Sequence, residues 1–110
     1  MAWRTSTLDG VLVGAPQGRV DESNWEAFSV NLVAAIAKAG PQGRFVVDLS
    51  GIDYMSSRGL RALSTALAAA KAAGVAMSLA APGDGMRQIL AISRYDKLFA
   101  VHASIAVATD

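Results

Sequence analysis

Hydrophobic and polar positions follow two patterns along this chain: short apolar runs, and longer stretches with helical spacing. Weak alternation over residues 3–8 is followed by Asp9–Gly10 and then by the apolar run Val11–Leu12–Val13. Apolar runs on both sides of an Asp-Gly pair are typical of a β-hairpin. We therefore expect strands near residues 3–8 and 11–16, with residues 15–20 forming a loop that leads to a helix.

The first helix has the clearest start and end signals. Ser23 and Glu26 have the spacing of a capping box, and the acidic residues before them suit the positive end of a helix dipole. Gly40–Pro41 predicts the end of this helix, since glycine is favoured just after a helix and proline cannot continue one. One apolar stripe at spacings of three and four joins the two ends: Trp25, Phe28, Leu32, Ile36 and Ala39.

A strand–loop–helix unit follows. The apolar, β-branched run Phe45–Leu49 predicts a central strand covered on both faces, and residues 50–56 are expected to be a loop. The next helix is expected to begin near Ser57, run to about Lys71 and close at Gly74, because alanine is the best helix former and glycine the usual C-terminal signal. Its apolar face comprises Leu60, Leu63, Leu67 and Ala70.

Shorter signals predict the remaining elements. These are a strand over residues 75–79, a turn over 82–85, a short helix marked by Met86, Ile89, Leu90 and Ser93, a last strand over 98–101, and a final short helix within 103–110.

Alternating strands and helices predict an α/β fold: one domain over residues 1–110, with a mixed, mostly parallel sheet, an N-terminal hairpin and about four helices. In such sheets the loops after the strands gather at one edge, here Gly18–Asp21, Ser50–Ser57 and Ala81–Gly83. The predicted core comprises Trp25, Phe28, Leu32, Ile36, Val46, Val47, Leu60, Leu63, Leu67 and Ile89.

Composition narrows the class of protein. Hydrophobic residues make up 53% and charged residues 17%, which excludes intrinsic disorder. The net charge of +1 comes from scattered basic residues, so nothing predicts nucleic-acid binding. The chain has no cysteine, in keeping with a reducing cytoplasm, and no apolar run near the ~20 residues that span a bilayer. We therefore expect a cytoplasmic protein without membrane insertion.

Little in the sequence supports catalysis. His102 is the only histidine, Gly83–Asp84–Gly85 is expected to be a turn, and no glycine-rich phosphate loop is present. Asp48 and Asp53 could lie near each other, but a chain this short offers little wall for the cleft that a pair of catalytic carboxylates needs. We predict no catalytic residue, no metal site and no cofactor.

The informative segment is residues 46–63, which reads as strand, loop, hydroxyl pair and helix. Asp48–Leu49–Ser50 closes the strand, and Ser56–Ser57–Arg58–Gly59–Leu60 opens the helix. This segment resembles the signature of the STAS domain family, in which D-L-S is followed by a hydrophobic loop and D-S-[ST]-G-L. Gly18–Arg19–Val20–Asp21 is similar to the family's G-R-L-D. Two positions differ, because Ser56 replaces an acidic residue and Arg58 replaces a small one.

The resemblance implies a stand-alone anti-sigma factor antagonist, a monomer or weak dimer without turnover of its own. Ser57 matches the family's phosphorylatable serine, with Ser56 as the alternative acceptor. The implied partners are an anti-sigma factor with serine kinase activity and a serine phosphatase. The implied partner-binding residues are Asp21, Ser56, Ser57, Arg58 and Arg61.

The residues themselves leave alternatives open. Ser56 or Ser57 could serve only as a helix N-cap, whereas a phosphate at that helix end could pair with Arg58 and Arg61. Two other functions are considered: a non-switching STAS module in a signalling scaffold or a lipid or anion transport complex, and a small enzyme that uses Asp48 or Asp53.

Overall fold

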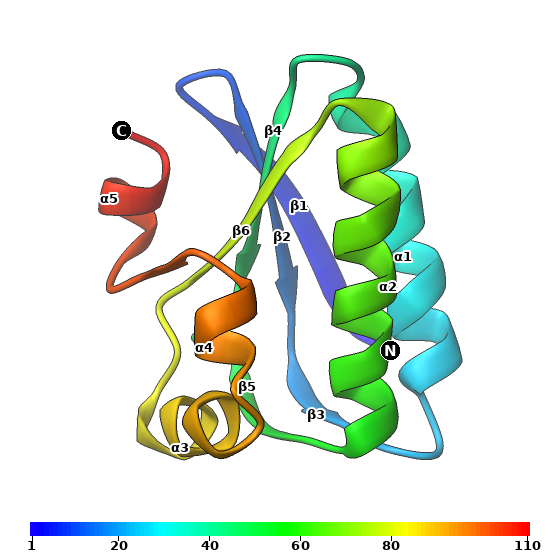
Figure 1. The fold of residues 1–110 in the computed structure, drawn as a ribbon, viewed down its shortest axis with the longest axis vertical. Coiled ribbons are helices and arrows are strands. Elements are labelled where there is room, and N and C mark those ends of the chain that lie inside the picture. The colour runs from blue at the N-terminus through cyan, green and yellow to red at the C-terminus, as the bar shows by residue number, and fades with distance from the viewer.

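Seven strands and five helices alternate along the chain in a computed structural model that describes residues 1–110 (Figure 1). The strands are β1 (Trp3–Leu8), β2 (Val11–Pro16), β3 (Gly18–Val20), β4 (Arg44–Asp48), β5 (Ile52–Met55), β6 (Ala76–Ala80) and β7 (Val101–His102). The helices are α1 (Trp25–Ala39), α2 (Ser57–Ala73), α3 (Asp84–Ile92), α4 (Tyr95–Leu98) and α5 (Ile105–Ala108).

The main sheet is mixed, as the sequence predicts. Its strand order is β1-β2-β4-β6-β7, with an antiparallel β1–β2 hairpin and parallel pairing from β2 onward. The short strands β3 and β5 pair in parallel with each other and form a separate ladder beyond the end of the main sheet. The predicted α/β class and the N-terminal hairpin are confirmed.

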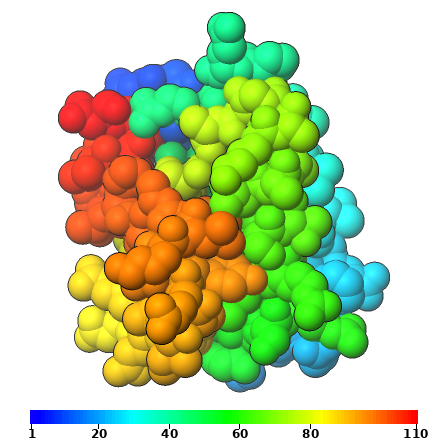
Figure 2. Space-filling model, viewed as in Figure 1, coloured from blue at the N-terminus to red at the C-terminus, as the bar shows by residue number.

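Helices cover both faces of the sheet. Helices α1 and α2 lie side by side on one face, and α5 lies on the other (Figure 1). The segment around α4 fills the surface between α2 and α5 (Figure 2), where the Tyr95 hydroxyl lies 3.3 Å from the Ser64 Oγ. Side chains alternate along each strand, so Phe45 and Val47 enter the large core under α1 and α2, whereas Val46 enters a smaller core under α5.

Most of the predicted core is buried. Phe28, Leu32, Ile36, Val47 and Leu63 belong to one cluster of 23 buried residues, as do Leu60 and Leu67. Trp25 and Ile89, also predicted for the core, pack against that cluster but are only partly buried at its rim. Trp25 lies at the first turn of α1, where the helix has only begun to cover the sheet.

The predicted capping box does not form. Helix α1 begins at Trp25, its N-cap is Asn24, and no side chain caps it. The Asp21 carboxylate explains the difference, because it accepts hydrogen bonds from both the backbone N–H and the hydroxyl of Ser23, at 2.9 and 2.6 Å. Ser23 is thereby held in a turn before the helix and cannot cap it.

Two other segments differ from the prediction. Residues 15–20 and 50–56 were expected to be loops, but they contain β3 and β5. The strand expected over residues 98–101 starts only at Val101. Arg94 adopts a left-handed conformation (φ 63°), and the chain turns there into α4, a helix that was not predicted. Phe99 then packs against the ring of Tyr95 and anchors this turn.

Candidate functional site

Ser56 and Ser57 are neighbours with different surroundings. Ser56 is the N-cap of α2: its N–H donates to the Val20 carbonyl at 2.8 Å, and its Oγ accepts from the Gly59 N–H at 3.3 Å. Only 9% of Ser56 is exposed. Ser57 is the first residue of α2, is exposed, and makes no side-chain hydrogen bond. The buried hydroxyl is thus engaged in the fold, while the adjacent one is free in solvent.

The β3–β5 ladder positions this helix start. Val20 pairs with Met55 in the ladder, and both side chains are buried. Gly59, in the first turn of α2, packs so closely on them that a Cβ there would lie 2.6 Å from Met55 Cγ and 2.8 Å from Val20 Cγ1. The first turn therefore rests directly on the two strands, and Ser57 lies at the outer edge of a closely packed junction.

Asp21 follows β3 and organises the turn before α1. In addition to the two bonds from Ser23, its Oδ2 lies 3.1 Å from the Arg19 Nε. Donation by the Ser23 hydroxyl and N–H, and then the positive charge of Arg19, hold the pKa of the Asp21 carboxyl below its ordinary value. The side chain lies at the predicted edge and is 29% exposed. Its carboxylate contacts Ser23 and Arg19 within its own turn.

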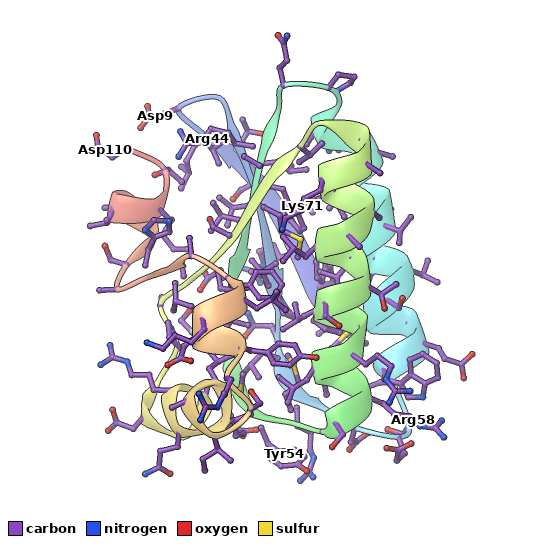
Figure 3. All side chains as sticks on the ribbon, in the orientation of Figure 1. Asp9, Arg44, Tyr54, Arg58, Lys71 and Asp110 are labelled. Carbon is purple, nitrogen blue, oxygen red and sulfur yellow. The ribbon has the colours of Figure 1, made fainter.

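Arg58 reaches from α2 to the start of α1. Its Nε lies 3.1 Å from the Glu22 Oε2, and its guanidinium carbon lies 5.5 Å from the centroid of the Trp25 ring. Figure 3 shows Arg58 at the foot of α2, on the side of α1. The side chains of the ion pair are 59% and 66% exposed, so solvent screens the pair and we assign it at most about 1 kcal/mol. These contacts orient Arg58 without locking it.

A shallow groove of about 320 Å³ runs between the first halves of α1 and α2. Helix α1 lines the groove with Trp25 and Ser29. Helix α2 lines it with Arg58, Arg61, Ala62 and Thr65. No acidic residue lines the groove, and Arg61 belongs to neither of the two ion pairs in the structure. The groove therefore presents positive charge and hydroxyl groups beside an aromatic face.

An aromatic side chain lies at the same end of the molecule. Tyr54 of β5 is exposed, and the Arg19 guanidinium carbon lies 4.8 Å above its ring (Figure 3). Tyr54, Trp25 and Glu22 were not predicted as site residues, because their place beside the site depends on which segments meet in space. The β3–β5 pairing brings Arg19 to Tyr54, and the packing of α1 on α2 brings Glu22 and Trp25 to Arg58.

The other candidate residues make no contact with one another that would indicate a catalytic pair. The Asp48 carboxylate accepts the Ser50 N–H in a tight turn, whereas Asp53 is an exposed residue of β5. His102 is half-buried in β7. No three His, Cys, Asp or Glu side chains converge, and no helix has the length and hydrophobicity needed to cross a bilayer.

Comparison with known proteins identifies the fold that carries this site. The family model described as "Mlab, STAS domain" matches residues 15–101. The chain belongs to the STAS domain family. Among curated proteins it is 41% identical over 54 residues to BtrV of Bordetella bronchiseptica, a proposed anti-sigma factor antagonist. That alignment covers 49% of this chain and 45% of BtrV, less than half of either protein.

Solved structures agree with the STAS fold. An anti-sigma factor antagonist from Mycobacterium paratuberculosis has a TM-score of 0.85 at 23% identity, covering 97% of this chain and 89% of that one. The Bacillus cell fate determinant SpoIIAA, in its phosphorylated form, has a TM-score of 0.64 at 16% identity, covering 91% and 90%. These likenesses concern the fold.

Proposed function

We propose that this STAS domain is an anti-sigma factor antagonist that acts in the cytoplasm and is switched by phosphorylation of Ser57. In the unmodified state it would bind an anti-sigma factor with serine kinase activity and so release a sigma factor. Family membership and the partial likeness to BtrV support the class of protein. The surface that we assign to the partner is the edge formed by Asp21, Ser56, Ser57, Arg58 and Arg61.

The observation that carries this proposal is the accessible hydroxyl of Ser57 beside the engaged hydroxyl of Ser56. A kinase needs an exposed oxygen that can attack the γ-phosphorus of ATP; the new O–P bond forms as the bond to ADP breaks, and the hydroxyl proton leaves. Transfer to Ser56 would require opening the first turn of α2. A serine phosphatase would reverse the modification of Ser57 by hydrolysis.

The switch would be electrostatic. A phosphoserine carries close to two negative charges near neutral pH, and burying it against a partner without matching donors costs free energy. Within the protein itself, the N-terminus of α2 tolerates the charge, because the helix dipole and free N–H groups favour an anion there. The phosphorylated SpoIIAA structure supports the idea that a STAS fold accommodates a phosphate.

The test uses anti-sigma factors with kinase domains from the same genome. Each is incubated with the protein and ATP, the phosphate is mapped by mass spectrometry, and binding is titrated for wild type, phosphorylated protein, Ser57→Ala and Ser57→Asp. We expect phosphate on Ser57, binding by Ser57→Ala, and at least ~tenfold weaker binding of the phosphorylated protein, which corresponds to ~1.4 kcal/mol.

Two further variants delimit the surface. Ser6→Asp places the same charge on the exposed edge strand β1 and should bind as wild type does. Asp21→Ala should cost more binding free energy than free energy of unfolding. Phosphate on Ser56, or equal binding of modified and unmodified protein, would contradict the switch.

The second candidate is a STAS module without a switch, in a signalling scaffold or a lipid or anion transport complex. Ser56 and Arg58 favour it, since the first replaces the acidic residue of the family pattern and the second is drawn into contacts with α1. A partner that binds phosphorylated and unmodified protein equally well is the outcome that this candidate predicts.

A further inference from the structure

Arg58 and Arg61, near the start of α2, differ in the contacts that their side chains make. Arg58 contacts Glu22 and the Trp25 ring, both of which belong to the α1 side of the groove. Arg61 is exposed, takes part in no ion pair, and donates no side-chain hydrogen bond. Arg61 is therefore the unpaired cation of this surface.

Helix geometry also separates the two arginines relative to Ser57. Successive residues of an α-helix are about 100° apart, so Arg58 projects about 100° away from Ser57, toward α1. Arg61 stands four residues along, about 40° from Ser57 and one turn higher on the same face. Side chains at this spacing are neighbours, whereas those of adjacent residues diverge.

No carboxylate of the protein forms an ion pair with Arg61. The Asp21 carboxylate is occupied by Ser23 and Arg19, and the Glu22 carboxylate by Arg58. Asp53, an exposed residue of β5, and Glu26, in the first turn of α1, belong to no ion pair. The first turn of α2 holds no acidic residue, so a phosphate on Ser57 would be the anion nearest to Arg61 on its own helix face.

We propose that Arg61 is the internal acceptor of a phosphate on Ser57, while Arg58 keeps its contacts with Glu22 and Trp25. The proposal rests on the phosphorylation of Ser57 proposed above. A guanidinium can donate two parallel hydrogen bonds to a phosphate, and it binds one better than an ammonium group does. Pairing with Ser57 would turn the Arg61 side chain away from the groove that it lines, so phosphorylation would change the charge of the groove as well as that of the helix end.

The experiment uses the full chain with phosphoserine installed at position 57 through an expanded genetic code. The second pKa of the phosphate is measured by ³¹P NMR titration in wild type, Arg61→Gln, Arg58→Gln and the control Lys71→Gln, which removes a charge from the far end of α2. A cation beside the phosphate stabilises the dianion and lowers this pKa. We expect Arg61→Gln to weaken the second acid dissociation about twofold, as the size of an i,i+4 charge pair implies, and both other variants to change it clearly less.

A second readout follows the arginine itself. The Nε–H resonance of Arg61 should shift through the same titration, that of Arg58 should not, and Arg61→Lys should retain part of the effect. Melting curves verify that every variant is folded.

An Arg58→Gln effect as large as that of Arg61→Gln, or no effect of either, would overturn the assignment. The outcome is separable from the proposed function, because no kinase is involved. Failure of every kinase to modify Ser57 would refute the switch, whereas this titration would still report which arginine the phosphate pairs with.

Discussion

Replacing Ser56 by alanine should destabilise the protein, whereas replacing Ser57 should not. Ser56→Ala removes the oxygen that accepts the Gly59 N–H and leaves that N–H without a partner in a buried place. Loss of a serine N-cap costs about 0.5–2 kcal/mol. The bond is fairly long at 3.3 Å, so we expect about 1 kcal/mol. Ser57→Ala removes no hydrogen bond and substitutes a better helix former, so its effect should stay within about 0.5 kcal/mol.

The assay is urea unfolding followed by far-UV circular dichroism, with thermal melts as a second measure. A chain of 110 residues has an unfolding entropy of about 0.2 kcal/mol/K, so a stability loss of about 1 kcal/mol lowers the melting temperature by about 4 °C. Ser56→Asp is the matched control, since a carboxylate also accepts the Gly59 N–H and suits the positive end of the helix dipole. It should recover most of the lost stability.

Equal losses in the two alanine variants, or a larger loss for Ser57→Ala, would refute the division of roles between the two serines. If the expected difference is found, the binding data for Ser57 variants can be interpreted without a correction for stability. Any loss of partner binding by Ser57→Asp would then report on the interface rather than on the fold.

Three further predictions concern the support of the site. Gly59→Ala should cost about 1–3 kcal/mol in urea unfolding despite the better helix propensity of alanine, because its Cβ would collide with Val20 and Met55; unchanged stability would mean that the neighbours yield. Leu63→Ala should cost about 2–5 kcal/mol, since Leu63 is fully buried, and a loss below about 1 kcal/mol would contradict its place in the core. Ser23→Ala should raise the pKa of Asp21 in an NMR carboxyl titration, because it removes the strongest donor. As the folded pKa of Asp21 lies below its unfolded value, its contribution to stability is present above the unfolded pKa and is lost as pH falls through the lowered one; an unmoved pKa in Ser23→Ala would contradict this account.

The parts of the fold that were predicted correctly have strong local signals. The run Phe45–Leu49 predicted β4, since a central parallel strand must be apolar on both faces. Helix α2 was predicted from its leucine spacing and alanine content, and Gly74 closes it in a left-handed conformation (φ 75°), as expected. From these elements the sequence also predicted that Ser57 begins a helix, which is where the structure has it.

The parts that were missed depend on partners far away in the chain. Strands β3 and β5 have three and four residues, too few for a visible alternation, and each exists because it pairs with the other across more than thirty positions. The capping box predicted at Ser23 does not form, because the Asp21 carboxylate accepts two hydrogen bonds from Ser23 in a turn. The groove was invisible for the same reason, because its walls come from two helices.

The geometry of this junction is compatible with the proposed switch, because a charge could be added at the start of α2 without loss of the helix. Ser56 supplies the cap and the link to β3, and Gly59 allows the first turn to lie against Val20 and Met55. None of these contacts uses the Ser57 side chain, so a phosphate there adds charge without removing a stabilising contact. A phosphate on Ser57, as proposed, would leave the cap, the link to β3 and the packing of Gly59 in place. Under the proposed function, this charge would act on the neighbouring Arg61 and on the partner's surface, as a switch that works by electrostatics rather than by a change of fold requires.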